Sequence, residues 1–77
     1  MTAMAPESTE LAIRDLIKQL QARLEQAITI ANEAQTCIEA SSPIEAVKLA
    51  LNSALPIYEA TLLLDAVGLM QAKVAPT

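Results

Sequence analysis

The sequence is poor in the residue types that most catalytic and ligand-binding sites need. It contains no histidine, one cysteine, one glycine and one aromatic residue. A single glycine excludes a glycine-rich loop that cradles phosphates, and no cluster of Cys, Asp or Glu has the spacing of metal ligands. The carboxylates are spread along the chain, whereas catalysis needs titratable groups that converge in a pocket. We therefore expect no enzymatic activity, no cofactor and no metal site.

Positive charge is also scarce. The chain carries five basic and nine acidic residues, for a formal net charge of −4. Because nucleic-acid binding needs clustered Lys and Arg and usually stacking aromatics, this balance argues against nucleic acid, and likewise against an anionic membrane surface. Residues 1–7 lack the basic and apolar regions of a secretory signal. The lone Cys37 cannot form an internal disulfide, which fits a reducing compartment. The sequence predicts a cytoplasmic protein.

A long uninterrupted apolar run is missing as well. The most apolar stretch lies in the second half of the chain, where Glu59 and Asp65 interrupt it. A membrane-spanning helix needs about 20 predominantly apolar residues. We therefore expect no contact with a membrane.

What the chain does have is apolar and helix-forming. Hydrophobic residues make up 53% of its 77 residues. Ala, Leu, Glu and Gln dominate the composition, which is typical of an all-α protein. A chain of this length lies near the lower limit for a self-sufficient core, so it needs additional contacts.

A heptad repeat runs through the first half of the chain and predicts a helix over residues 8–41, with Ser8 as its N-cap and residues 1–7 as a flexible leader. Additional apolar residues beside the repeat make the stripe wide enough to need two neighbouring helices. The repeat itself, with alternating steps of four and three residues, comprises Ile13, Ile17, Leu20, Leu24, Ala27, Ala31, Ala34 and Ile38, and the residues beside it are Leu16, Ile28, Ile30 and Cys37.

The clearest local signal is the start of a second helix. Ser42 is predicted to cap it, Pro43 to occupy its first position, and Glu45 to close a capping box with Ser42. The turn over residues 41–43 is short, so the two helices should form an antiparallel hairpin.

The second helix is expected over residues 43–73, followed by a flexible tail at residues 74–77. Pro56 removes a backbone hydrogen bond, and therefore predicts a kink or a break near residues 52–56, where Ser53 is available as a new cap. The predicted fold is all-α: one helical hairpin domain over residues 8–73, which as a dimer would complete a four-helix bundle.

One stripe of the second helix is expected to face the first helix, namely Ile44, Val47, Leu51, Leu55, Tyr58, Leu62, Ala66 and Leu69. Beyond Pro56 the remaining sides are apolar too, and a helix that is apolar all round must be buried all round. A hairpin has only one other helix to cover it, which predicts a protein–protein interface. The candidate partner-binding residues are Ile57, Tyr58, Ala60, Leu63, Leu64, Val67 and Met70.

Two of the side chains on the second helix allow alternative interpretations. Tyr58 is either an interface anchor, since aromatics are enriched in binding hot spots, or the largest filler of the hairpin core. Asp65 lies in an apolar run, and is either a carboxylate at the edge of the apolar face or a specific polar contact with a partner.

Three short runs resemble a known family: residues 20–27, Leu-Gln-Ala-Arg-Leu-Glu-Gln-Ala; the turn Ser42-Pro43-Ile44-Glu45; and Tyr58-Glu59-Ala60 leading to Leu62-Leu63-Leu64. In this order they resemble the small cytoplasmic co-chaperones of type III secretion systems, of the PscE and YscE type. The resemblance implies a helical hairpin that binds a tetratricopeptide-repeat chaperone and helps to keep the secretion needle subunit from polymerising. The surplus apolar residues of the second helix would then face the partner. The alternative is a homodimeric helical bundle that serves as a dimerisation or docking module.

Overall fold

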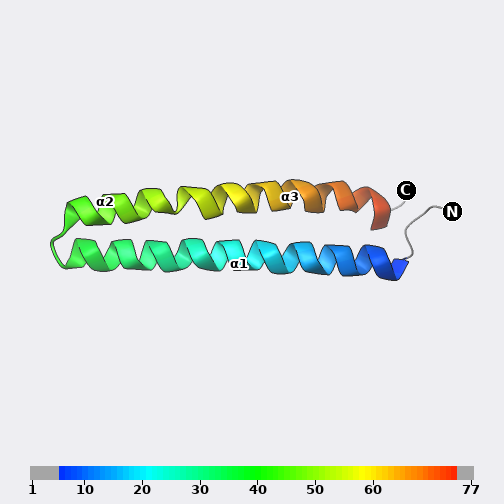
Figure 1. Cartoon of the computed structure of the whole chain (residues 1–77), viewed down its shortest axis with the longest axis horizontal. Helices are drawn as coiled ribbons and strands as arrows, with labels where there is room; N and C mark the ends of the chain where they lie inside the picture. The colour runs from blue at the N-terminus through cyan, green and yellow to red at the C-terminus, as the bar shows by residue number, and fades with distance from the viewer. Residues whose placement is uncertain (1–5, 75–77) are drawn as a thin grey trace.

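The protein is a long helical hairpin. The computed structural model describes residues 6–74, which form three helices: α1 (Pro6–Glu39), α2 (Pro43–Asn52) and α3 (Ala54–Val74). Helices α2 and α3 follow one another almost end to end and run antiparallel to α1 (Figure 1). The rod measures 60 × 19 × 15 Å. The expectation of an all-α antiparallel hairpin is confirmed.

Helix α1 begins earlier than the sequence pattern indicates. It starts at Pro6, a residue whose fixed φ suits the first helical position, so Ser8 lies within the first turn and is not the N-cap. The remainder of the predicted leader, residues 1–5, lies outside the described residues. Helix α3 continues to Val74, so the predicted tail is helical at its first residue, and residues 75–77 also lie outside the described part.

The turn after α1 is closed by backbone hydrogen bonds. Ser42 N–H donates to the carbonyl of Cys37 (2.8 Å) and Ser41 N–H to that of Ile38 (3.0 Å), which is the Schellman pattern. Ser41 has a φ of 65°, a left-handed conformation that glycine normally provides. Pro43 occupies the start of α2 as predicted, but the side chain of Ser42 makes no capping hydrogen bond, so the predicted capping box is wrong.

The second arm breaks where Pro56 predicts. Helix α2 ends at Asn52 and α3 begins at Ala54, and the arm bends by about 22° near the proline. Between them, Ser53 is the C-cap of α2: its backbone N–H and its hydroxyl both donate to the carbonyl of Ala50, at 3.2 and 2.6 Å. Pro56 falls in the first turn of α3, where a missing N–H is tolerated.

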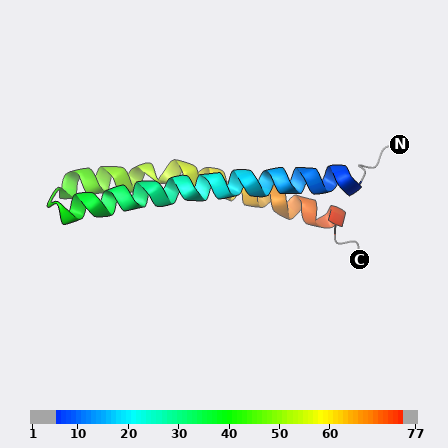
Figure 2. The same ribbon diagram turned by 90° about the horizontal axis from the view of Figure 1, so that it is seen from below.

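The side chains between the two arms follow a heptad pattern, which we call the inner seam. Steps of four and three residues relate them, as in a two-stranded coiled coil, and the arms cross one another in Figure 2. The buried or half-buried members are Thr9, Ile13, Leu16, Leu20, Arg23, Ala27, Ile30, Ala34 and Cys37 on α1, and Ala46, Leu49, Ser53, Pro56, Ala60, Leu63, Val67 and Met70 on the second arm.

The inner seam is a thin core. Within residues 8–73, whose side-chain burial the structure describes, its buried hydrophobic side chains are those of Ala46 and Ala60, each 4% exposed, with Pro56 buried at the bend between them. No large side chain of this part of the chain is completely buried. The half of the hairpin nearest the turn brings together mainly small residues, which let the two helices approach closely but remove little apolar area from water.

The sequence pattern misplaces the contact face of α1 by part of a turn. Four of the expected residues, Ile13, Leu20, Ala27 and Ala34, do lie in the inner seam. The other four are exposed on one flank, and their places are taken by residues that were expected beside the repeat. The exposed residues are Ile17, Leu24, Ala31 and Ile38, and those that replace them include Leu16, Ile30 and Cys37.

Candidate protein-binding surface

The most exposed apolar side chains lie on the face of α2 and α3 that points away from α1. Positions on this face recur at steps of four and three residues, so they form a second heptad stripe that crosses the bend. We call it the outer stripe: Ile44, Lys48, Leu51, Leu55, Tyr58, Leu62, Asp65 and Leu69. Its six apolar members are between 49% and 76% exposed. Nothing within the described hairpin covers them.

The two faces of the second arm are therefore exchanged relative to the sequence expectation. Ile44, Leu51, Leu55, Tyr58, Leu62 and Leu69 were expected to contact α1, and they are exposed. Of the candidate partner-binding residues, Ile57, Tyr58 and Leu64 are exposed, at 50%, 60% and 55%. Ala60 is buried, and Leu63, Val67 and Met70 are half-buried in the inner seam, so the expectation that these four point away from α1 is wrong. Binding of a partner by the exposed three stays a prediction.

A second apolar surface runs along one flank of the hairpin, between the arms. We call it the flank groove; from α1 it is lined by residues spaced seven apart, such as Leu24, Ala31 and Ile38. Its middle is a hollow of about 420 Å³, walled by Leu24, Ala27, Ile28, Ala31, Ser53 and Ile57. A smaller hollow nearer the turn is walled by Ala34, Gln35, Ile38, Ala46, Val47 and Ala50.

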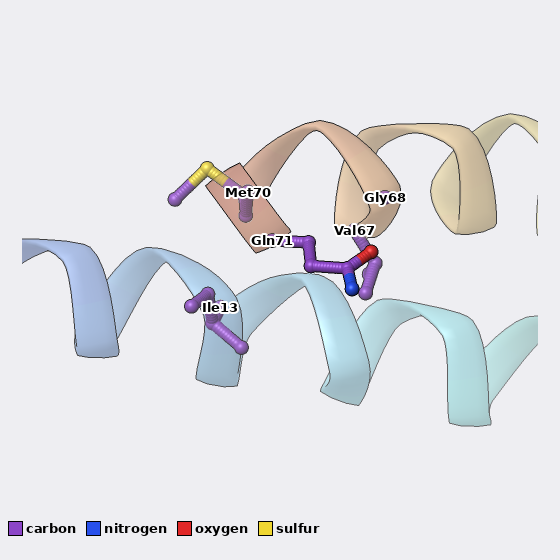
Figure 3. Close-up of a pocket in the computed structure, with 5 residues that line it drawn as sticks. All are labelled: Ile13, Val67, Gly68, Met70 and Gln71. Carbon is purple, nitrogen blue, oxygen red and sulfur yellow. The ribbon is translucent and has the colours of Figure 1, made fainter. Parts of the chain in front are cut away.

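The groove reaches the open end of the hairpin. There Ile13 of α1 lies across from Val67 and Met70 of α3, and Gln71 extends its amide into the gap (Figure 3). Gly68 belongs to the same wall, and a Cβ added to it would meet nothing within 4 Å. The glycine is therefore not required by close packing inside the hairpin.

The opposite flank is polar and carries the ion pair that links the arms. Arg23 Nε lies 3.2 Å from Glu59 Oε1, with side chains 39% and 41% exposed, and Gln19 lines the adjacent hollow. Arg23 takes an inner-seam position, while the neighbouring positions of the seam are occupied by apolar residues such as Leu16, Leu20 and Ala27. It was not among the residues expected to matter, although a lone arginine at heptad spacing from Leu16 and Ile30 was a usable signal. A polar residue in a seam fixes the register of the two helices.

The exposed surface of α1 carries polar pairs between residues one turn apart. Arg14 pairs with Glu10 at 3.0 Å, and Gln19 donates to Asp15 at 2.7 Å. Gln35 donates in the same way to Glu39 at 3.2 Å. Such pairs along a helix face are typical of a surface exposed to solvent. The hairpin thus has a polar side, formed by α1, and an apolar side, formed by α2 and α3.

Two further properties of the chain bear on function. Within residues 6–74, no group of three or more His, Cys, Asp or Glu side chains is placed to hold a metal ion. The segment Pro43–Lys73 has the length and composition of a helix that crosses a membrane, and 11% of its apolar window is buried. Length and composition alone do not separate a membrane surface from a protein surface, so the expectation of no membrane contact stays a prediction.

No family model, curated protein or solved structure matches this chain. Its function is therefore inferred from the fold and from the two apolar surfaces. The resemblance to the secretion co-chaperones stays a prediction.

Proposed function

We propose that this protein is a helical adaptor: a hairpin that covers apolar helical surface on a partner polypeptide and is itself completed by that contact. The observation that carries the proposal is the contrast between its inside and its outside. Among residues 8–73, fourteen large apolar side chains are between 47% and 76% exposed, while the buried hydrophobic side chains of the core are those of two alanines. Contiguous exposed apolar surface of this kind marks interaction sites in soluble proteins.

The exposed area supports a stable contact. A compact monomer of 8.2 kDa would expose about 4,500 Å² by the usual scaling of surface with mass. The hairpin exposes 5769 Å². The elongated shape of 60 × 19 × 15 Å spreads this excess of roughly 1,200 Å² over all faces, and it exceeds the about 800 Å² that each partner contributes to a standard interface.

The charges favour a protein partner over a lipid bilayer. Helix α1 is paired with α2 and α3 along their length and carries charged side chains on its outer face. If α2 and α3 crossed a membrane as part of this hairpin, α1 would cross it too, and placing its charges in the membrane is costly. Helices that lie on a membrane surface usually present Lys and Arg beside their apolar face. Here α2 and α3 carry Lys48 and Lys73 against Glu45, Glu59 and Asp65.

The family resemblance makes this proposal more specific. It predicts a tetratricopeptide-repeat chaperone as the partner, with the hairpin stabilising the groove in which that chaperone holds a secretion needle subunit. Co-expression with such a chaperone and needle subunit tests this version: a stable ternary complex supports it, and a needle subunit that polymerises regardless contradicts it.

The adaptor proposal is tested on the purified protein, by measuring mass, helicity and binding of an apolar dye over a dilution series. We expect either self-association or a monomer that binds the dye and unfolds with weak cooperativity, because its apolar surfaces are uncovered. A monodisperse monomer that unfolds cooperatively and binds no dye would refute the proposal.

A further inference from the structure

We infer that the outer stripe is the contact surface of an antiparallel homodimer, in which α2 and α3 of one copy pack against α3 and α2 of a second copy. The inference rests on the proposed function, because it names the polypeptide that covers one of the two apolar surfaces. It leaves the flank groove available to a different helix.

The outer stripe is complementary to itself when one copy is reversed. The stripe residues occupy the two alternating positions of a heptad, a and d. In an antiparallel pair an a position of one helix lies opposite a d position of the other. With the two-fold axis between Pro56 and Ile57, every apolar member of the stripe meets an apolar member of the second copy. Ile44 lies opposite Leu69, Leu51 opposite Leu62, and Leu55 opposite Tyr58, and each of these contacts occurs twice, as two-fold symmetry requires.

The two charged members of the stripe decide the orientation. In the antiparallel arrangement Lys48 of each copy lies opposite Asp65 of the other. A parallel pair would instead place Lys48 beside Lys48 and Asp65 beside Asp65, and like charges placed together at an interface are strongly unfavourable. Within the hairpin, Lys48 has only an exposed contact with Glu45, at 3.6 Å, so it is free to turn to a second copy. Asp65, exposed in the run Leu62-Leu63-Leu64-Asp65, forms no ion pair within the described hairpin, and this arrangement provides one.

The available area is sufficient for such a dimer. The four most exposed large apolar side chains of the described residues, Ile44, Leu51, Leu55 and Leu69, all belong to the outer stripe. A standard interface takes about 800 Å² from each partner, which is less than the roughly 1,200 Å² of excess surface that the scaling with mass gives, so a dimer of this size leaves surface for the flank groove.

A charge-swap cycle tests the proposed register. Lys48→Asp, Asp65→Lys and the double variant are compared with the natural sequence by sedimentation equilibrium from high dilution to high protein concentration. All three keep the hairpin intact, since both side chains are exposed, and circular dichroism verifies this. Lys18→Asp, an exposed change of the same sign on α1, is the matched control.

Each single swap should weaken dimerisation by about tenfold or more, because each dimer contains two like-charge contacts in place of two opposite-charge ones. The double variant should recover to within about threefold of the natural affinity, and Lys18→Asp should change it by less than about threefold. The proposed register is overturned if the single swaps leave the dimerisation affinity unchanged, or if the double variant does not recover the affinity that the single swaps lose.

Cross-linking tests the antiparallel orientation independently. Ile44→Cys and Leu69→Cys are made separately in a Cys37→Ala background, which removes the natural free thiol. Oxidation should link the two proteins when they are mixed, and neither alone, because the two copies of residue 44 would lie roughly 37 Å apart at about 1.5 Å per residue. Cross-linking of each variant with itself contradicts the inference.

The remaining outcomes separate the inference from the proposed function. A protein that stays monomeric at high concentration and binds an apolar dye overturns the homodimer and leaves the adaptor proposal intact. A monomer without dye binding overturns both. Flotation with phosphatidylcholine vesicles is compared for the natural protein and for the double variant Leu55→Gln, Leu62→Gln. If the protein floats and the double variant floats equally well, the outer stripe is not the lipid-binding face. If the double variant no longer floats, lipid is the occupant of the stripe and the homodimer is overturned.

Discussion

Replacing Leu55 by glutamine tests whether the outer face of the second arm is an interface. The side chain of Leu55 is 63% exposed in the hairpin. Leucine and glutamine have similar helix propensities, so the change should leave the isolated hairpin nearly as stable as before. Leu11→Gln is a matched control, because Leu11 is 62% exposed on the outer side of α1, where no partner is expected.

The expected effect of Leu55→Gln follows from the exposed fraction. Fully burying a leucine contributes about 1.5–3 kcal/mol, so covering the exposed 63% of Leu55 contributes roughly 1–2 kcal/mol per chain by the same principle. A homodimer contains this contact twice, which gives roughly 2–4 kcal/mol, or a loss of affinity between about 30-fold and several hundred-fold.

Sedimentation equilibrium and thermal unfolding at several protein concentrations measure this difference. Leu55→Gln should lower the midpoint of unfolding at high concentration and have little effect at high dilution, whereas Leu11→Gln should have little effect at either. Equal responses of the two variants would show that the outer stripe is ordinary solvent-exposed surface, and the reasoning from exposed area would fail.

Three further predictions concern the hairpin itself. Ser41→Gly should raise stability by about 1 kcal/mol, or roughly 4–8 °C in the midpoint of thermal unfolding, because glycine adopts a positive φ without strain; a lower midpoint would contradict the left-handed turn. Arg23→Leu should raise the free energy of unfolding in urea by about 1 kcal/mol, since the partly exposed pair with Glu59 contributes less than an apolar side chain in the seam. Pro56→Ala should join α2 to α3, because it restores an N–H for the carbonyl of Asn52, and should raise the free energy of unfolding by roughly 1–2 kcal/mol. Amide hydrogen exchange around the former break should become slower, and unchanged exchange would contradict this prediction.

The sequence predicted features that depend on local chemistry. Pro43 and Pro56 act on the backbone of their own turn, so the start of α2 and the break before α3 followed from single residues. The details of capping did not follow: backbone N–H groups of Ser41 and Ser42 close the end of α1, while the side chain of Ser42 makes no capping hydrogen bond to α2.

Which face of the second arm contacts α1 was not predictable from periodicity. Two stripes at the same heptad spacing run along α2 and α3, and the one with larger side chains was expected inside. The structure places the smaller residues inside, among them Ala46, Ser53 and Ala60, because small side chains allow close approach to the alanines of α1. Size complementarity between two helices is a property of the pair and is absent from either helix alone. Of the candidate site, Ile57 and Leu64 are exposed as expected. Ala60 is buried instead, because its small side chain fits between the two arms.

The alanine-rich part of the inner seam has a consequence for turnover in the cell. Because Ala27, Ala34 and Ala46 bury little area, separating the two arms near the turn costs little free energy. A copy without a partner therefore opens its backbone to proteases more often than an assembled one. We expect surplus copies to be degraded first, so that the cellular amount of the protein follows the amount of whatever completes it. Limited proteolysis at high dilution and at high concentration would measure this difference directly.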